Sequence, residues 1–251
     1  FLDLQVRARR HDVLLDLAIL VVHDDHFAVP VDDDDLVVLR RDVLDVDELK
    51  AAVDRARELG ALLASDECYA ELGWDEWSDK LIPSALDPRV CGDSHEGILV
   101  CYSLSKQSNL AGYRAAFAVG EASLVKGLVN LRMHSGLNTP APTQKVMTVA
   151  LGDYEHVAVE KELYRERREI LLAAVRGYGF ELSDSQAGLY LWATLGEDCW
   201  KTVDRMAELG IVVVPGTFYG EHSTQHVRFS LTATDDKIEE AANRLRNAVR
   251  L

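Results

Sequence analysis

The chain has 251 residues, of which 48% are hydrophobic and 27% are charged, and this balance is typical of a globular protein with a sizeable core. Its formal net charge of −15 argues against nucleic-acid binding, which needs a basic face, and no apolar run approaches the ~20 residues of a membrane span. Because the four cysteines lack Cys-x-x-Cys spacing, we expect neither a metal site nor a disulfide framework, and a cytoplasmic location.

Residues 1–42 differ in composition from the rest of the chain. They contain ten Asp, eight Val and eight Leu, but no Gly, Lys or Glu. The four consecutive aspartates at 32–35 are typical of a solvated or disordered segment. We therefore regard 1–42 as an anomalous segment, and our hypothesis is that it is an out-of-frame or degenerate stretch.

Ordinary α/β patterning begins at Val43. Helical spacing of apolar residues, an aspartate cap and a closing glycine predict a helix over 46–59. Short apolar runs predict strands over 61–65, 97–102 and 114–119. This alternation of helices with short, buried strands indicates a mostly parallel α/β layer.

The middle of the chain reads as helical, and a smaller α/β unit follows it. Helices are expected over about 121–135, from 143 onward after a break at 138–142, and over about 155–177. Charged residues over 160–169 predict a solvated face on the last of these helices. The remaining pattern predicts strands over 188–194, 211–214 and 226–231, and helices over 198–209 and 235–250.

Two short motifs carry the chemistry. Ser103-Leu-Ser-Lys106 directly follows a predicted strand, and Leu-Ala-Gly-Tyr-Arg114 comes shortly after it. Asp66-Glu-Cys-Tyr69 follows the strand before, so both groups are expected at one edge of a parallel sheet. Singly, each residue has an ordinary surface or capping explanation. Together, an amine, a carboxylate, a phenol, hydroxyls and a guanidinium suit pyridoxal 5'-phosphate, an aldehyde cofactor with a phosphate.

These motifs resemble those of fold-type I, class I/II aminotransferases. After the anomalous segment, the chain is similar to the C-terminal part of that family, and the motifs at Tyr69 and Lys106 are most similar to the succinyldiaminopimelate aminotransferases of lysine biosynthesis. The resemblance implies an α/β fold with part of a cofactor-binding large domain at 43–165. A smaller C-terminal α/β domain is expected at 166–251, so the domain boundary falls inside the long helix.

The resemblance also implies roles for individual residues. Lys106 is expected to bind the cofactor aldehyde as a Schiff base and to move a proton at the substrate's α-carbon. Asp66 is expected to pair with the pyridine nitrogen, and Tyr69 to donate to the ring oxygen. Arg228 is expected to bind the substrate's α-carboxylate through its two-pronged guanidinium. The cofactor phosphate is expected to be bound by Ser103, Ser105 and Arg114.

The implied activity is transfer of an amino group between an amino acid and a 2-oxo acid. N-succinyl-diaminopimelate and 2-oxoglutarate are the candidate pair, and the family works as homodimers. Other fold-type I enzymes, such as lyases and decarboxylases, share the same lysine and arginines and stay open as alternatives. Another alternative is an inactive, truncated homologue. Val38-Leu-Arg-Arg41 takes the place of the family's Asn-Pro-Thr-Gly, and no glycine precedes Gly60 to form a phosphate loop.

Overall fold

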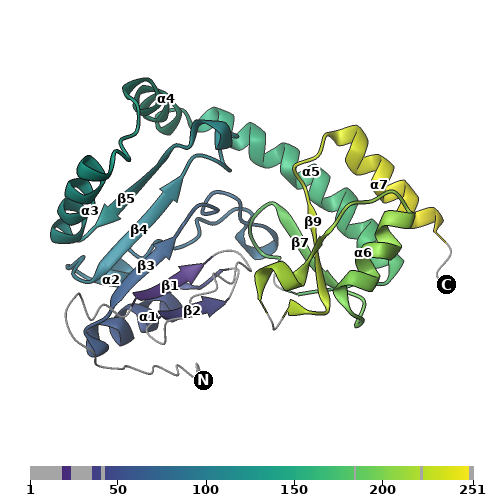
Figure 1. Ribbon diagram of the computed structural model, residues 1–251, viewed down its shortest axis with the longest axis horizontal. Helices are drawn as coiled ribbons and strands as arrows, with labels where there is room; N and C mark the ends of the chain where they lie inside the picture. Colours follow the sequence, from purple (N-terminus) through teal and green to yellow (C-terminus); the bar gives the residue numbers. More distant parts are fainter. Residues whose placement is uncertain (1–18, 24–35, 41–42, 184, 221–222, 249–251) are drawn as a thin grey trace.

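The computed structural model describes residues 19–23, 36–40, 43–183, 185–220 and 223–248. This part of the chain forms two β-sheets, one toward each end of the molecule, with the long helix α5 (Tyr154–Tyr178) extending from one to the other (Figure 1). The expected α/β class is confirmed. Among the described helices, none is long and apolar enough to cross a membrane.

The first sheet has five strands in the order β2-β1-β3-β4-β5. All neighbouring strands are parallel except β4 and β5, as the expected mostly parallel layer requires. The strands are β1 (Ile19–His23), β2 (Leu36–Arg40), β3 (Leu62–Asp66), β4 (Ile98–Ser103) and β5 (Ala116–Gly120).

Strands β1 and β2 lie inside the anomalous segment, where sequence analysis predicted none. Both are runs of aliphatic residues, ILVVH and LVVLR, and β1 pairs with β2 on one side and β3 on the other. β-branched and aliphatic residues favour strands, and this preference outweighs the acidic composition around them. The aspartates at 32–35 lie outside the described residues.

Helix α1 (Val46–Leu59) confirms the local prediction in detail. Asp45 accepts a hydrogen bond from the backbone N–H of Glu48, and Glu48 accepts one from the backbone of Asp45, which forms a capping box. Gly60 ends the helix in the left-handed region at φ 64°. α1 packs beside the short α2 (Pro88–Cys91), and both helices share a core with β3 and β4.

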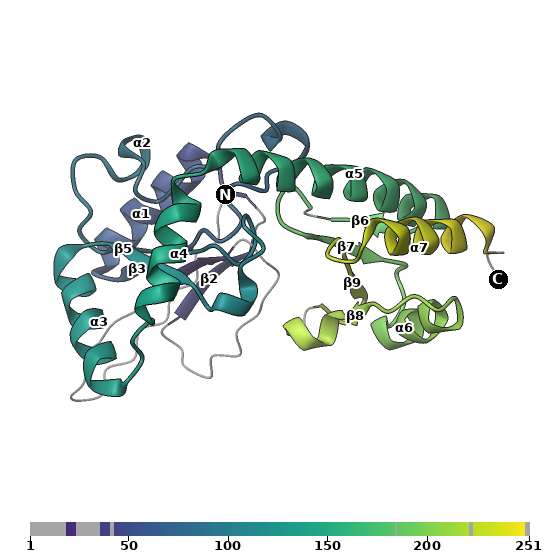
Figure 2. The ribbon, with the colours of Figure 1, turned by 90° about the horizontal axis from the view of Figure 1, so that it is seen from above.

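Helices α3 (Ala122–Ser135) and α4 (Ala141–Leu151) follow β5, and Figure 2 shows α3 on the side of the first sheet away from α1 and α2. Both were predicted, with α4 beginning two residues earlier than expected because Pro140 precedes its first turn. α3 has no buried residue, and Leu131 in it is 62% exposed. This helix therefore contributes little apolar burial.

The second sheet is antiparallel in the order β6-β7-β9-β8. Its strands are β6 (Glu181–Leu182), β7 (Tyr190–Thr194), β8 (Val214–Pro215) and β9 (His226–Ser230). The range predicted for the strand at 211–214 was wrong, because β8 covers only Val214–Pro215. Ile211 and Val213 are buried and Val212 is 93% exposed, so the alternation is real, but only the last residue of that run pairs with β9. The two-residue β6 was not predicted.

Helices α5, α6 (Cys199–Glu208) and α7 (Asp235–Asn247) surround this sheet, and α7 lies along the second half of α5 (Figure 2). All three were predicted. The solvated face expected over 160–169 is only partly correct, because the Tyr164 and Arg168 side chains on it are buried. The predicted domain boundary near residue 165 lies inside α5 and stays a prediction.

Candidate active site

The two motif-bearing strands end side by side. Asp66 is the last residue of β3 and Ser103 the last of β4, and these strands are parallel, with Asp66 in register with Cys101. The backbone N–H of Glu67 donates to the carbonyl of Cys101 (2.9 Å), which continues the pairing past the end of β3. Because carboxyl ends of parallel strands form the usual ligand-binding edge of an α/β sheet, this edge is the candidate site.

A tight loop after β4 presents Lys106. Leu104 anchors it: its side chain is buried, its N–H donates to Ala115 (3.3 Å) and its carbonyl accepts from Leu110 (3.2 Å). Asn109 takes the left-handed conformation at φ 50°, which asparagine tolerates better than most residues. The loop is therefore closed by its own backbone, with Lys106 half-buried between its ends.

Helix α5 supports this loop from outside. His156 lies 2.8 Å from the Ser108 hydroxyl. Asn109 donates to Glu160 (2.6 Å) and accepts from the Tyr164 hydroxyl (2.8 Å). These contacts come from successive turns of one helix face, so the first half of α5 holds the loop in place.

The hydroxyls predicted to bind phosphate are adjacent. Ser103 donates to the Ser105 hydroxyl (2.8 Å), and its own hydroxyl accepts from the Ser105 backbone N–H (3.2 Å). Arg114 follows a 3-10 turn at Ala111–Tyr113, takes a left-handed conformation at φ 51°, and is exposed. Its guanidinium donates to the Ala111 carbonyl (3.1 Å). Within the described residues, no hydrogen bond or ion pair joins Arg114 to either serine.

The Lys106 amine lies between two tyrosines. Its Nζ donates to the Tyr190 hydroxyl at 3.3 Å, and it lies 5.6 Å from the centre of that ring and 5.1 Å from the centre of the Tyr69 ring. The two rings meet edge to face with centroids 6.3 Å apart. Aromatic faces attract an ammonium, so this pair fixes the position of the amine.

Arg228 joins the same group from the second sheet. It lies on β9, opposite Trp192 of β7 and Val214 of β8. Its guanidinium carbon is 4.0 Å from the centre of the Tyr190 ring and 5.2 Å from that of Tyr219. The structure thus brings the predicted substrate arginine and the predicted cofactor lysine to the same tyrosine, although they are far apart in sequence.

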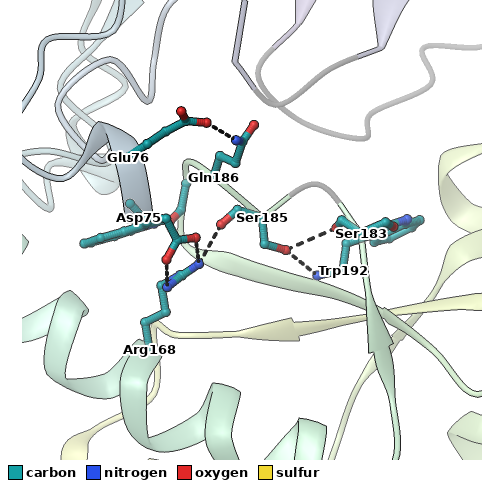
Figure 3. A network of polar contacts seen from close by, with 9 residues as sticks. Asp75, Glu76, Arg168, Ser183, Ser185, Gln186 and Trp192 are labelled. Atoms are coloured by element: carbon teal, nitrogen blue, oxygen red, sulfur yellow. Dashed lines mark hydrogen bonds and ion pairs between the residues drawn. The ribbon is translucent and has the colours of Figure 1, made fainter.

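A polar network ties the loop after Tyr69 to the second sheet, as Figure 3 shows. The buried guanidinium of Arg168 on α5 donates twice to Asp75 (3.2 and 2.7 Å) and once to the Ser185 carbonyl (2.9 Å). The Ser185 hydroxyl in turn accepts from the Trp192 backbone N–H (3.2 Å), and Gln186 donates to Glu76 (2.7 Å). These bonds fix the loop that follows Tyr69 against the strand that carries Tyr190.

Glu67 and Cys101 are ionisable residues at this edge of the first sheet. Burial raises the pKa of Glu67, although hydrogen bonds from the backbone of Ala85 (2.8 Å) and the hydroxyl of Ser65 (3.0 Å) partly oppose the shift. Burial also raises the pKa of the neighbouring Cys101 thiol, and the charges of Asp66 and Glu67 add to that shift. Both shifts favour the uncharged form of the group.

The residues present fit pyridoxal phosphate by their chemistry. A held amine suits its aldehyde, two adjacent hydroxyls and an exposed guanidinium suit its phosphate, and the Asp66 carboxylate suits a protonated ring nitrogen. Sequence analysis assigned no role to Tyr190, which lies within the strand predicted over 188–194. Tyr190 is half-buried, whereas its neighbours Leu189 and Leu191 are buried.

Comparisons with known proteins identify the family of this chain. A family model described as aminotransferase class I and II matches residues 42–245. The chain is 49% identical over 203 residues to OxyQ of Streptomyces rimosus, a 4-dedimethylamino-4-oxo-anhydrotetracycline transaminase, covering 81% of this chain and 55% of that protein. It is 48% identical over 203 residues to a "probable aminotransferase" of Mycobacterium tuberculosis, covering 81% of this chain and 48% of that protein.

Solved structures of aminotransferases are also similar to this chain. A "probable N-succinyldiaminopimelate aminotransferase" from Thermus thermophilus superposes with a TM-score of 0.74 at 25% identity, covering 93% of this chain and 72% of that one. The chain spans about half the length of the curated relatives it matches. It belongs to the class I and II aminotransferases, a family of fold-type I enzymes that depend on pyridoxal phosphate.

Proposed function

We propose that this chain carries the lysine-bearing part of an enzyme that transfers an amino group between an amino acid and a 2-oxo acid. The observation that supports it most is the Lys106 amine held by Tyr69 and Tyr190 at the carboxyl edge of the first sheet, with Arg228 stacked on the same Tyr190. An amine beside a guanidinium suits a substrate that bears an amino group and a carboxylate on one carbon.

Each proposed residue has a role that follows from its chemistry. Pyridoxal phosphate, when bound, supplies an aldehyde and an electron-accepting ring. Lys106 would bond to the aldehyde and, once displaced by substrate, move a proton at the α-carbon. Asp66 would orient the ring through its nitrogen, Tyr69 would donate to the ring oxygen, and Arg228 would hold the carboxylate. The phosphate would be bound by Ser103, Ser105 and Arg114.

The substrates we propose are N-succinyl-diaminopimelate as amino donor and 2-oxoglutarate as acceptor, which places the enzyme in lysine biosynthesis. The similarity to the Thermus structure supports N-succinyl-diaminopimelate as the donor. We also propose a cytoplasmic homodimer, as in the family. The 49% identity to OxyQ favours a second candidate acceptor class, ketones on large polycyclic substrates.

A donor panel tests the proposal. The purified chain with pyridoxal phosphate and 2-oxoglutarate is given N-succinyl-LL-diaminopimelate, LL-diaminopimelate or an aromatic amino acid, and glutamate formation is followed by mass spectrometry. Glutamate formation that Lys106→Ala abolishes is expected. A chain that binds the cofactor yet forms no glutamate would favour the inactive homologue, and carbon dioxide release would favour a decarboxylase.

A further inference from the structure

Tyr190 contacts both Lys106, which is proposed to bind the cofactor, and Arg228, which is proposed to bind the substrate. It lies on β7, half-buried, and its hydroxyl and its ring have separate contacts. The hydroxyl accepts from the Lys106 amine at 3.3 Å, while the ring centre lies 4.0 Å from the guanidinium carbon of Arg228. One side chain therefore joins the amine proposed to bind the cofactor with the cation proposed to bind the substrate carboxylate.

The backbone around Tyr190 fixes where its side chain stands. The N–H of Gly188 donates to the Leu72 carbonyl in the loop after Tyr69 (3.0 Å). On the other side, the N–H of Leu231 donates to the Leu189 carbonyl (2.9 Å). Directly before Tyr190, the backbone is thus hydrogen-bonded both to the loop after Tyr69 and to the residue that follows β9. Because its backbone is hydrogen-bonded on both sides, the Tyr190 side chain projects from a fixed position.

The hydroxyl contacts the Lys106 amine, and the ring contacts both that amine and the Arg228 guanidinium. A long lysine side chain has considerable rotamer freedom, and a hydrogen bond at its end, together with two aromatic faces, selects one position of the amine. A planar guanidinium stacked on an aromatic ring keeps its plane, and hence the direction of its N–H groups, fixed. The centre of the Tyr219 ring, 5.2 Å from the guanidinium carbon, provides a second aromatic contact.

We propose that Tyr190 is a positioning residue with two separable effects: its hydroxyl places the Lys106 amine, and its ring orients Arg228. The effect on substrate rests on the function proposed above, whereas the contact with the amine is a property of this chain without cofactor. Removal of the hydroxyl alone changes the amine and leaves carboxylate binding intact. Removal of the ring changes both.

Amine labelling of the cofactor-free protein tests the first effect. Wild type, Tyr190→Phe and Tyr178→Phe are treated briefly with acetic anhydride, and peptide mass spectrometry gives the labelling rate of Lys106 relative to exposed Lys126. Tyr178, buried at the end of α5, is the matched control for loss of a phenol hydroxyl. We expect Lys106 to be labelled roughly three- to tenfold faster in Tyr190→Phe, the range that loss of one hydrogen bond produces, and unchanged in Tyr178→Phe. Equal Lys106 rates in Tyr190→Phe and wild type would overturn the proposal.

Steady-state kinetics with the best donor from the panel test the second effect. Tyr190→Phe should lower kcat and keep the donor KM within about twofold, whereas Tyr190→Leu should raise that KM by roughly tenfold or more. A KM that rises equally in both variants, or in neither, overturns the assignment of the ring to Arg228. Wild type that takes up no pyridoxal phosphate would refute the proposed function, and the labelling result would still decide whether Tyr190 holds the amine.

Discussion

Replacing Arg168 by methionine tests the network of Figure 3, because it removes the guanidinium and keeps a long side chain at that position. The Arg168 side chain is 8% exposed, whereas that of its partner Asp75 is 58% exposed. The variant loses the bidentate pair with Asp75 and the bond to the Ser185 carbonyl. No other described element supplies a cation to either acceptor.

The size of the loss follows from the exposure of each partner. Asp75 can be rehydrated, so its ion pair is worth about 0.5–1 kcal/mol. The bond from the buried guanidinium to the Ser185 carbonyl is charge-assisted and is worth about 1.5–3 kcal/mol. The Nε of Arg168 is buried without a hydrogen-bond partner among the described residues, and methionine removes that cost. We therefore expect Arg168→Met to lower the free energy of unfolding by about 1–3 kcal/mol.

Urea unfolding followed by tryptophan fluorescence measures this change, since Trp74 lies in the same loop and donates to Gly188 (2.6 Å). Arg165→Met is the matched control. Arg165 is three residues earlier on α5, 44% exposed, and pairs only with the surface residues Glu162 and Glu169 among the described residues. It should change stability by less than about 0.5 kcal/mol. Equal losses in the two variants would refute the reasoning.

Three further substitutions test single positions. Burial holds the pKa of Glu67 above its ordinary 4.5. The contribution of this group to the free energy of unfolding is therefore greatest below pH 4.5, and it falls as the pH rises and the buried carboxyl group loses its proton. Glu67→Gln, whose amide oxygen can accept the same two bonds, should therefore raise the urea midpoint at pH 8 and leave it unchanged at pH 4; equal shifts at both pH values would contradict this. At Gly120, φ is 153° and an added Cβ would lie 2.1 Å from the Ile98 carbonyl oxygen, so Gly120→Ala should cost more than about 2 kcal/mol of unfolding free energy. Gly127→Ala in α3, where a Cβ meets open space, should instead stabilise by up to about 1 kcal/mol, and a similar loss in both variants would refute the steric argument.

Elements fixed by local signals were predictable from the sequence. The start of α1 at the Asp45 cap, its end at Gly60 and the strands β3, β4 and β5 all follow from neighbouring residues. The placement of Lys106 just after a buried strand was predictable for the same reason. β1 and β2 were missed because unusual composition was given more weight than two short aliphatic runs.

Contacts between distant parts of the chain were not predictable. The position of Tyr190 beside Lys106 depends on how the second sheet meets the loop after β4. The burial of Arg168 depends on Asp75 and Ser185 approaching it from two different segments. A single sequence contains the residues of such contacts but no pattern that pairs them, because each partner has an ordinary local explanation.

The central claim is that Lys106 is the amine that binds pyridoxal phosphate. The most direct measurement is to incubate the purified chain with the cofactor, reduce it with borohydride and map the modified peptide by mass spectrometry, with Lys106→Ala in parallel. We expect the reduced cofactor on Lys106 in the wild type and no site-specific modification in the variant. Modification of another lysine, or equal incorporation in Lys106→Ala, would contradict the account.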